Sequence, residues 1–450
     1  MVAAWPPACG ARSLSFERDF RVEMKSIQSI RGMNDVLPDH SAAWQRVEAT
    51  AREVLTRYGY LEMRTPILEH TELFSRSIGE TTDVAEKEMY SFEDRNGESL
   101  SLRPEATAGL VRAGLEHGLF HNQQQRVWLM GPMFRRERPQ RGRFRQFWQI
   151  DVEAFGIPGP DVDAEIILIS ARILSELGLK GLRLELNSLG TTESRWEYRE
   201  KLREYFDSHR DELDEDSLRR LDANPLRILD SKNPELKELI TGAPSMLDSL
   251  DEESRNHFDA VVETLSQAGV DHEINPRLVR GLDYYTRTVF EWISDSLGAQ
   301  GAVCAGGRYD GLVELLGGRP TPAIGFAMGV ERLIDLVAAG GAGDPDPGSP
   351  PHVYLVAQGD AAVRKALLLA EQLRSALSRL RLVNNCGGGS FKSQFKRADR
   401  SGALWAVVLG EEEMAQGTVI LKHLRADHAQ ETLAIAELEG RLEALVAGKT

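Results

Sequence analysis

The segment FRRERPQRGRFRQFWQ, residues 134–149, decides how the rest of this sequence is interpreted. Its residues 135–145 contain six arginines and one glutamate, a local charge of +5 in a chain whose formal net charge is −15. Guanidinium groups bind phosphate oxygens in a bidentate way that lysine cannot match. The segment therefore indicates a phosphate-binding element, and a solvated turn is the alternative.

The turn residues of this segment predict a hairpin. Pro139 and Gly142 place a loop in its middle. The two flanks can then pair, which puts Arg135 and Arg145 on strands and the other arginines on a projecting tip. Phe147, just beyond the second flank, fits either base stacking or an ordinary core.

A second polar cluster, RGLDYYTR at residues 280–287, lies in a strand-like segment. One arginine, one carboxylate and two phenols suit a pocket for a polar small molecule. A polar sheet face with structural tyrosines is the alternative. Strand alternation would put four of the side chains on one face: Arg280, Leu282, Tyr284 and Thr286.

Two glycine-containing segments follow. AGGRYDG, residues 305–311, permits close approach of a ligand to the backbone, although a glycine pair is also common in turns. GFAMGVERL, residues 325–333, predicts a strand of small residues that runs into a helix. Arg332 near the start of that helix could stack on a flat ring or pair with phosphate, and a surface arginine is the alternative. Neither segment is a P-loop or a GxGxxG fingerprint.

The composition is that of a soluble globular protein of two or three domains, with 450 residues, 42% of them hydrophobic and 27% charged. No apolar run is long enough for a transmembrane helix. The three cysteines are far apart, which favours a reducing cytoplasm over a disulfide framework or a zinc site, and no metal site is expected. The acidic balance argues only weakly against a nucleic-acid partner, because local patches can oppose the total.

The pattern of elements divides the chain into four parts. Residues 1–25 carry no hydrophobic period and predict a disordered extension. Residues 26–337 predict one domain with a mostly helical insertion at about 191–260, rich in charged residues at helical period. The Gly- and Pro-rich stretch 338–351 predicts a linker. Residues 352–450 alternate as β-α-β-α-β and predict a small α/β domain.

Within the larger domain the first elements are a helix and a set of strands. The helix starts at Pro38, with Asp39 or Ser41 as its cap. The strand GYLEMRTPIL should stop at Pro66, since proline cannot donate to a ladder. Residues 86–153 hold apolar and aromatic stretches separated by polar turns, which predicts an antiparallel sheet.

Taken in order, these clusters resemble motifs of the class II aminoacyl-tRNA synthetases. FRRER, its loop and FRQFWQ resemble the second class motif, GFAMGVERL the third, and GYLEMRTPIL the first, dimer-forming motif. IRGMNDVLP, TDVAEKEMYSF, LRPEATAG, CAGGRYDGL and above all RGLDYYTRTVFEW resemble histidyl-tRNA synthetases in particular. The likeness runs from about Ser26 to the C-terminus.

This resemblance implies an α+β fold. The catalytic domain would be built on a six- or seven-stranded antiparallel sheet with a helical insertion, followed by a C-terminal α/β anticodon-binding domain. The family also implies a cytoplasmic homodimer. Histidine would attack the α-phosphate of ATP, with Mg²⁺ on the β- and γ-phosphates, and histidyl-adenylate would then charge the terminal adenosine of the histidine tRNA.

The resemblance also implies residue roles. Arg280 and Arg135 would be the catalytic cations. Arg135, Glu137, Phe147 and Arg332 would bind ATP. Histidine would be held by six residues: Glu105, Thr107, Gln149, Glu153, Tyr284 and Tyr285. Two places would meet the tRNA, the hairpin tip at the acceptor end and a basic face of a helix in the C-terminal domain. Their residues would be Gln140, Arg141 and Arg143, and Lys392, Lys396 and Arg400.

Two departures and two rival interpretations stand beside this assignment. Ala106 replaces a glycine common in relatives, and Trp148 replaces a histidine. The basic helix face could be only solvated. The rival functions are the regulatory subunit of ATP phosphoribosyltransferase, which typically lacks the C-terminal domain, and a non-catalytic RNA-binding module, which would not need all the clusters together.

Overall fold

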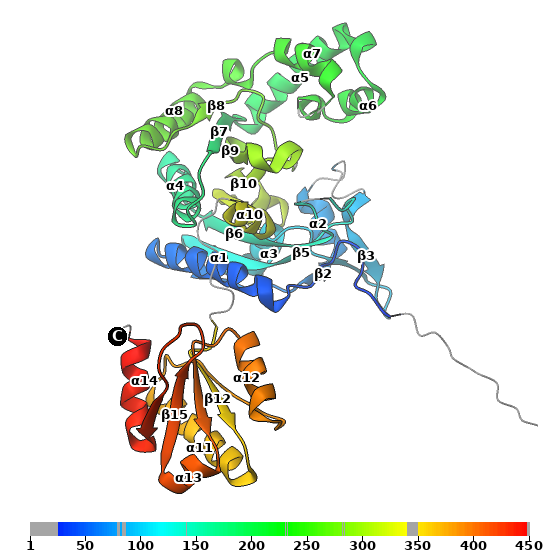
Figure 1. The fold of residues 1–450 in the computed structure, drawn as a ribbon. Coiled ribbons are helices and arrows are strands. Elements are labelled where there is room, and N and C mark those ends of the chain that lie inside the picture. The colour runs from blue at the N-terminus through cyan, green and yellow to red at the C-terminus, as the bar shows by residue number, and fades with distance from the viewer. Residues whose placement is uncertain are drawn as a thin grey trace, which may run out of the picture.

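The computed structural model describes residues 26–78, 82, 87–140, 142–229, 231, 233–280, 282, 284–339 and 350–447. The predicted N-terminal extension, most of the predicted linker and Arg141 lie outside the described residues. Figure 1 shows a body built round a central sheet, a group of helices beyond one edge of that sheet, and a separate C-terminal α/β unit.

The central sheet has eight strands in the order β1-β5-β6-β11-β10-β9-β7-β8. The six inner strands pair antiparallel, and the two-residue edge strands β1 and β8 pair parallel. The expected sheet of six or seven strands is therefore extended by short edges. The strands are β1 (Leu61–Glu62), β5 (Gln125–Phe134), β6 (Gln146–Phe155), β7 (Leu182–Ser188), β8 (Glu273–Ile274), β9 (Thr286–Ser294), β10 (Ala302–Arg308) and β11 (Ala323–Gly329).

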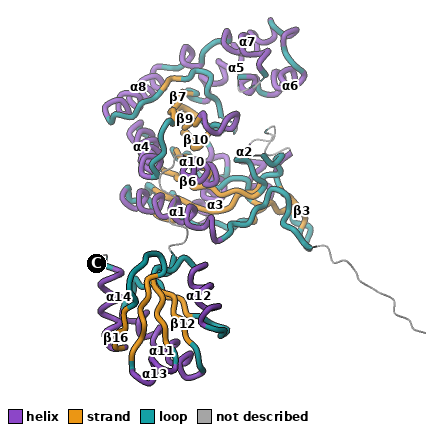
Figure 2. Tube along the Cα trace, in the orientation of Figure 1, coloured by secondary structure: helices purple, strands orange, loops and turns teal. Residues whose placement is uncertain are grey.

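Four helices pack against one face of this sheet (Figure 2), and the residues of the cavity described below lie on the opposite face. The helices are α1 (Pro38–Arg57), α4 (Pro160–Glu176), α8 (Glu252–Gln267) and α10 (Val330–Ala339). Along β6, Ile150 and Val152 enter the core beneath these helices, while Gln149, Asp151 and Glu153 alternate with them and face the opposite way. Because successive side chains of β6 point to opposite faces, this one strand supplies residues both to the core and to the cavity.

Two expectations for the N-terminal elements are wrong. The strands β2 (Leu68–His70), β3 (Tyr90–Glu93) and β4 (Ser99–Leu102) form a sheet of their own instead of joining the central one. Neither Asp39 nor Ser41 caps α1. Leu37 is the N-cap without a side-chain bond, and Pro38 occupies the first turn, where its fixed φ favours the helix. The Ser41 hydroxyl instead donates to the Leu37 carbonyl at 3.1 Å.

The segment 191–260 is built of helices. They are α5 (Thr192–Ser208), α6 (Glu215–Ala223), α7 (Lys237–Gly242) and α8, with the short 3-10 turns η2 (Arg210–Glu212), η3 (Pro225–Ile228), η4 (Pro234–Leu236) and η5 (Met246–Ser249) between them. Thr191, Asp214 and Asp251 each accept a backbone N–H at a helix start. A separate apolar cluster that includes Tyr198 and Phe206 holds these helices together.

The C-terminal unit has the predicted β-α-β-α-β order, and its five-stranded sheet runs β13-β12-β14-β15-β16. Its elements are β12 (Val353–Ala357), α11 (Asp360–Ala376), β13 (Leu382–Asn384), α12 (Phe391–Arg400), β14 (Trp405–Leu409), α13 (Glu411–Gln416), β15 (Thr418–His423), β16 (Glu431–Ala434), η7 (Ile435–Glu437) and α14 (Leu438–Val446). Three further elements, α2 (Thr71–Ile78), α3 (Thr107–Glu116) and α9 (Leu312–Leu315), and the turn η6 (Asp295–Gln300) complete the N-terminal body. Among the described helices, none combines the length and the apolar character needed to cross a membrane.

Candidate active site

A single cavity on the open face of the central sheet gathers the residues predicted to bind histidine and ATP. They come from the start of α3, the β5–β6 connection, strand β6, the segment before β9, and α10. All eleven line the cavity: Glu105, Thr107, Arg135, Glu137, Phe147, Gln149, Glu153, Arg280, Tyr284, Tyr285 and Arg332. Their roles toward a ligand stay predictions, but their convergence from distant parts of the sequence is a property of the fold.

The floor of the cavity is a trough between β6 and β11. Polar side chains at every second position of β6 face small residues on β11, with Glu153 paired opposite Gly325 and Asp151 opposite Ala327. A Cβ on Gly325 would lie 1.5 Å from Oε2 of Glu153, so only glycine leaves room for that carboxylate. The small-residue strand predicted at 325–329 therefore shapes the site.

One end of the cavity is acidic. The Glu105 carboxylate accepts the backbone N–H groups of Thr107 and Ala108, both at 2.8 Å, at the start of α3. One oxygen of Glu153 accepts the Thr107 hydroxyl at 2.7 Å and the other accepts the Tyr309 hydroxyl. Burial raises the pKa of Glu153 to about 8, and it also raises the pKa values of Glu105 and Asp151. A cation bound beside these carboxylates would lower their pKa values again, because it stabilises the ionised forms.

Three tyrosines wall the acidic end. The rings of Tyr284 and Tyr285 lie 4.8 Å apart, and Tyr309 packs edge-on to both. Arg195, from α5 in the helical segment, donates to the Tyr285 carbonyl and ties the wall to that segment. Tyr309 was not predicted as a site residue. The signal for it was the AGGRYDG segment, whose tyrosine directly follows the end of β10 and lines the cavity.

The segment 280–287 does not form the predicted alternating strand. Strand β9 begins only at Thr286, and Arg287 has a left-handed φ of 48°. Arg280 and Tyr284 precede β9 and reach the cavity from an irregular segment. The predicted alternation is therefore wrong, because Tyr285 lines the cavity together with Arg280, Leu282 and Tyr284, while Thr286 is not among its lining residues.

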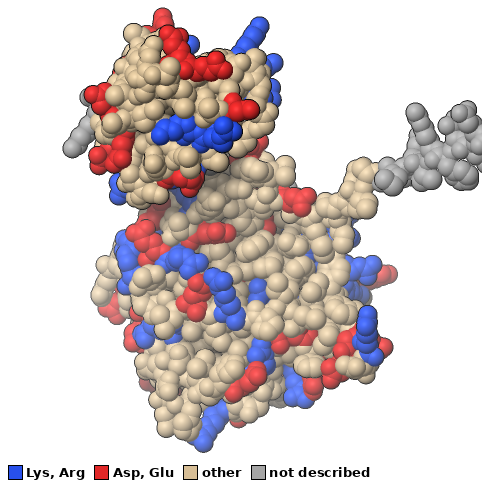
Figure 3. Space-filling view, turned by 90° about the horizontal axis from the view of Figure 1, so that it is seen from below, with Lys and Arg blue, Asp and Glu red and all other residues tan. Residues whose placement is uncertain are grey.

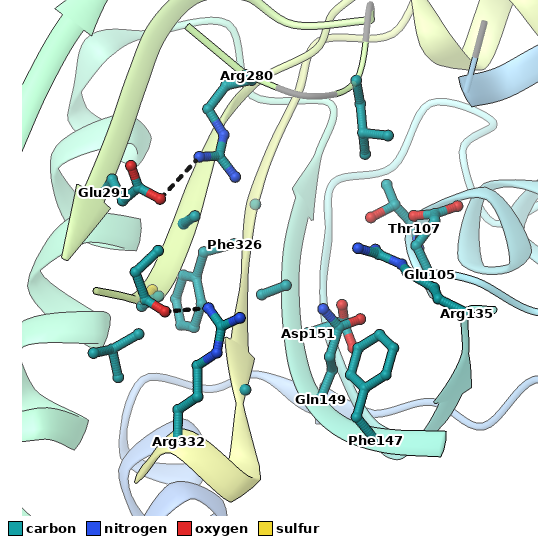
Figure 4. Close-up of a pocket in the computed structure, with 18 of the residues that line it drawn as sticks. Glu105, Thr107, Arg135, Phe147, Gln149, Asp151, Arg280, Glu291, Phe326 and Arg332 are labelled. Atoms are coloured by element: carbon teal, nitrogen blue, oxygen red, sulfur yellow. Dashed lines mark hydrogen bonds and ion pairs between the residues drawn. The ribbon is translucent and has the colours of Figure 1, made fainter. Parts of the chain in front are cut away.

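Three arginines also line the cavity, with Arg280 and Arg332 on one side and Arg135 on the other side, near Glu105 (Figure 4). The Arg280 guanidinium lies 3.4 Å from the carboxylate of Glu291 on β9. The guanidinium of Arg135 lies 5.3 Å over the Phe147 ring, while its Nε donates to the Pro104 carbonyl at 2.9 Å. Three arginines from three segments thus surround one space, with Arg332 as the third.

Arg332 links that space to the arginine-rich connection between β5 and β6. Its Nε donates to the Gly142 carbonyl at 3.1 Å, and it also donates to the Ala302 carbonyl at the start of β10. Burial and the nearby arginines lower its pKa. Glu137 forms an ion pair with Arg143 at 2.8 Å.

The predicted hairpin is present with shorter strands than expected. Strand β5 ends at Phe134 and β6 begins at Gln146, so Arg135 and Arg145 lie just beyond the strands. They still pair, because the Arg135 N–H donates to the Arg145 carbonyl at 2.9 Å. At the tip, Gln140 and Arg143 form an isolated bridge, and Arg141 lies outside the described residues.

The basic face predicted in the C-terminal unit lies on α12. Lys392, Lys396 and Arg400 are exposed there at successive i,i+4 positions. The Ser390 side chain caps the helix. The geometry is compatible with phosphate binding and equally with a solvated helix.

The arrangement suits ligands that bring both a cationic group and phosphates into the cavity. In the part of the chain that the structure describes, no three His, Cys, Asp or Glu side chains come together as a metal site. Charge stabilisation by fixed arginines in a partly buried cleft is the chemistry the cavity offers.

Comparison with known proteins identifies two family units. A family model described as histidyl-tRNA synthetase matches residues 32–333, and one described as anticodon binding domain matches residues 352–445. The histidine–tRNA ligase of Halorhodospira halophila is 57% identical over 94% of this chain and 99% of its own length. That of Alkalilimnicola ehrlichii is 59% identical over 91% of this chain and 94% of its own.

Solved structures agree with this assignment. The apo histidyl-tRNA synthetase of S. aureus is 36% identical, with a TM-score of 0.77, over 94% of this chain and 99% of that one. A Bacillus halodurans protein titled ATP phosphoribosyltransferase regulatory subunit/histidyl-tRNA synthetase is 21% identical, with a TM-score of 0.62, over 85% of this chain and 98% of its own, and shares the fold alone. The family match over two thirds of the chain and the near full-length relatives lead to one conclusion: this chain belongs to the histidyl-tRNA synthetase family, with the class II catalytic domain and an anticodon-binding domain.

Proposed function

We propose that this chain is a histidine–tRNA ligase whose cavity joins histidine to the α-phosphate of ATP, with release of pyrophosphate, and then passes the histidyl group to tRNA, with release of AMP. The single observation that carries the proposal is the charge pattern of the cavity, in which buried carboxylates and three arginines line one space. Histidine brings an ammonium group and an imidazole to the carboxylates, and ATP brings phosphates to the arginines. The curated relatives, both named histidine–tRNA ligases, point to the same reaction.

The histidine-binding half follows from the acidic end. Glu153 lies between two hydroxyl donors and three tyrosine rings, which suits an imidazole that donates a proton to a carboxylate. Thr107 and Glu105 lie at the start of α3 beside it, and Gln149 lies four residues earlier on β6. Donors and acceptors matched to both ring nitrogens would disfavour isosteres, because an incorrect ring leaves buried groups unpaired.

Catalysis follows from the arginines. As the histidine carboxylate attacks, negative charge grows on the α-phosphate oxygens and is stabilised by guanidinium groups already in place. Arg135 and Arg280 are proposed for this role, since Pro104 and Glu291 hold them on two sides of the space. No protein group is needed as a nucleophile.

The adenosine half of ATP is assigned to Phe147, Glu137 and Arg332, which lie around one part of the cavity. Mg²⁺ binds through one or two carboxylates plus substrate phosphates and keeps several waters. The half-buried Glu291 carboxylate beside the arginines fits that donor set and would hold the ion together with ATP. Bound there, Mg²⁺ would supply additional positive charge at the β- and γ-phosphates.

The tRNA contacts are assigned to the two basic regions. Gln140, Arg141 and Arg143 at the hairpin tip are proposed to meet the acceptor end, and Lys392, Lys396 and Arg400 on α12 the anticodon region. The match of residues 352–445 to an anticodon-binding domain supports the second assignment. We further propose domains at 26–337, with the insertion at about 191–260, and at 352–450, joined by the segment 338–351.

A cytoplasmic homodimer completes the proposal. Its support in this chain is exposed apolar surface at the N-terminal strands: Leu61 is 70% exposed, Phe92 is 49% exposed and Ile67 is 41% exposed. Exposed apolar groups on short edge strands favour burial against a second chain. Analytical ultracentrifugation tests this assembly directly.

The activity is tested by charging of a histidine tRNA transcript in the presence of histidine, ATP and Mg²⁺. We expect charging that depends on all three. Stimulation of ATP phosphoribosyltransferase without any tRNA charging would replace the proposal with the regulatory-subunit function.

A further inference from the structure

Arg308 is a fully buried arginine without a role in the scheme above. It is the last residue of β10 and lies directly before Tyr309, whose ring walls the proposed histidine pocket. The Arg308 side chain is 0% exposed and is not among the residues that line the cavity. Burial of a guanidinium is unfavourable unless its donors are paired, and an apolar side chain of similar volume often gives an equally stable fold. The buried charge therefore calls for an explanation other than stability.

The Arg308 guanidinium donates hydrogen bonds from all three of its nitrogens. Nη1 donates to the Ile157 carbonyl at 3.2 Å and to Oδ1 of Asp310 at 3.0 Å, and Nη2 donates to the Gly159 carbonyl at 3.0 Å. Asp163 on α4 accepts from Nε, at 3.2 Å, and from Nη2. Ile157 and Gly159 lie between the end of β6 and the start of α4. One buried charge thus joins β6, α4 and the turn that follows β10.

The turn that carries Tyr309 depends on this anchor, because regular strand pairing ends just before it. The pairing of β10 with β9 shifts its register between Gly307 and Arg308, and β10 ends at Arg308. Beyond that point the Tyr309 N–H donates to the Ala323 carbonyl at 2.7 Å. Oδ1 of Asp310 accepts the Ala323 N–H at 3.0 Å in addition to the Arg308 guanidinium. Arg308 therefore supports the backbone of Tyr309 through Asp310.

The same guanidinium also fixes the strand that carries the partner of Tyr309. The Tyr309 hydroxyl donates to Oε2 of Glu153. Glu153 lies on β6, four residues before Ile157, whose carbonyl binds Arg308. The donor and the acceptor of this hydrogen bond are thus tied to one point outside the cavity. Because a hydrogen bond weakens steeply when its distance or angle departs from the optimum, a small shift of either segment would weaken this contact.

Asp163, the carboxylate that binds Arg308, also supports a second part of the tyrosine wall. It lies 2.8 Å from Nε2 of His257 on α8, and because a carboxylate only accepts, Nε2 is the donor. Nδ1 of the ring can then accept from the Arg287 guanidinium, 3.5 Å away, and Arg287 follows Tyr285 by two residues. Although burial acts to raise it, the pKa of Asp163 is lowered, because His257 and Arg308 stabilise its ionised form. One ionised carboxylate is thereby linked to both tyrosine-bearing segments.

We propose that Arg308 is a positioning residue for histidine binding, which holds the Tyr309 hydroxyl on the Glu153 carboxylate. The inference rests on the proposed function, since Glu153 is there assigned to the imidazole of the substrate. Held in this way, the carboxylate keeps one orientation before histidine arrives. Arg308 itself touches neither histidine nor ATP, so its loss should act through Tyr309. In the alternative, the guanidinium only joins the sheet to α4, and its loss lowers stability without a selective effect on one substrate.

The test is a double-mutant cycle between Arg308 and Tyr309. Arg308→Lys keeps the charge but replaces the planar fork by a single ammonium, which cannot reach all four acceptor groups. Tyr309→Phe removes only the hydroxyl. KM for histidine, KM for ATP and kcat are measured in ATP–pyrophosphate exchange for the wild type, both single variants and the double variant. Thermal melting of each variant reports its folding.

Two further variants separate positioning from stability. Asp310→Ala removes the link between Arg308 and the Tyr309 turn. It keeps the test decisive if Arg308→Lys does not fold, because the Asp310 side chain is 36% exposed. Leu265→Ala is the matched control, since it opens a cavity at a buried position of α8, about two turns from His257.

Arg308→Lys and Tyr309→Phe should each raise KM for histidine by roughly tenfold, the usual loss for a hydrogen bond to a charged group. The double variant should be no worse than the worse single variant, because both changes remove the same contact. KM for ATP should stay within about twofold of wild type throughout. Asp310→Ala should also raise KM for histidine, and Leu265→Ala should lower the melting temperature while both KM values stay unchanged.

A folded double variant in which the two increases multiply, or an equal rise of KM for both substrates in Arg308→Lys, would overturn the assignment and leave Arg308 a structural residue. If Arg308→Lys does not fold, an unchanged KM for histidine in folded Asp310→Ala would do the same. A wild-type protein that shows no exchange with histidine would instead defeat the proposed function itself, so the two failures are distinguishable.

Discussion

At the scale of single residues, the cavity depends on charges held in place before any ligand arrives. Arg280 is fixed by Glu291, Arg135 by Pro104, and Arg332 by two backbone carbonyls. Fixed charges stabilise a transition state without reorganisation at the moment of reaction, so each of these contacts contributes to catalysis indirectly.

Arg280→Ala should abolish adenylate formation while the fold persists. Loss of a preorganised charge at the reacting phosphate lowers the rate by about 10²–10³, and ATP–pyrophosphate exchange with histidine measures it. The control is Arg319→Ala, which removes an exposed arginine outside the cavity. Near wild-type exchange in a folded Arg280→Ala variant would remove this residue from the mechanism.

The raised pKa of Glu153 predicts a pH-dependent stability. An unfolded glutamate has a pKa of about 4.3, and burial raises that of Glu153 to about 8. Between these values the folded ligand-free chain binds a proton that the unfolded chain does not. The free energy of unfolding should therefore fall as pH rises through this window, by up to about 1.4 kcal/mol per unit from this group.

Glu153→Gln should remove that part of the slope, as urea unfolding at several pH values would measure. The slope contributed by Glu105 and Asp151, whose pKa values burial also raises, should remain. Identical slopes in the variant and the wild type would mean that Glu153 is ionised in the empty cavity.

At the scale of elements, the site is produced by the pairing of β6 with β11. Polar side chains at every second position of one strand require glycine or alanine on the other. This pairing shows what sequence alone could and could not reveal. The alternation in QFWQIDVEAF predicts a strand, and Gln149 and Glu153 on one face of it.

The sequence could not reveal which strand pairs with β6, because register depends on contacts between distant segments. Asp151, a further cavity residue, was missed for a related reason. Its two-residue spacing from Gln149 and Glu153 was visible, but its burial in the cavity wall appears only when the neighbouring strands are in place. The separate sheet of β2, β3 and β4 was missed because a local pattern does not say which sheet a strand joins.

Gly325→Ala should prevent histidine from binding in the cavity. The new Cβ would lie 1.5 Å from the Glu153 carboxylate and 2.5 Å from the Val152 carbonyl, so the strand or the carboxylate must move. Overpacking of this kind costs about 1–3 kcal/mol, and exchange with histidine should fall below detection. Gly311→Ala is the control, since nothing lies within 4 Å of its Cβ position. Equal activity of the two variants would contradict the account of the trough.

Charge reversal on α12 separates tRNA binding from amino-acid activation. Replacing Lys392, Lys396 and Arg400 by glutamate should raise KM for tRNA at least tenfold, because each lost phosphate contact weakens binding. Exchange without tRNA should not change. The control variant replaces two exposed arginines elsewhere in the same unit, Arg364 and Arg379, by glutamate. An unchanged KM for tRNA would show that the α12 face is only solvated.

At the scale of the whole molecule, the acidic balance is unevenly distributed. Residues 351–450 contain 13 Lys and Arg against 11 Asp and Glu, so the net charge of −15 arises entirely from the rest of the chain. The face drawn in Figure 3 shows acidic and basic side chains interspersed rather than separated into large fields. An anionic partner is therefore restricted to local basic sites such as α12 and the arginine hairpin.

This distribution predicts that tRNA charging and histidine activation respond differently to salt. Few phosphate contacts give a moderate but definite salt dependence of tRNA binding. A fourfold increase in salt should raise KM for tRNA by about tenfold or more, while KM for histidine changes little. Equal salt sensitivity of both constants, measured on the same preparation, would contradict this separation.

The central claim is that the cavity activates histidine specifically. The most direct test is ATP–pyrophosphate exchange by the wild-type protein with each of the twenty amino acids in turn. Exchange with histidine alone is the predicted result. Exchange with any other amino acid, or none with histidine, would contradict the account.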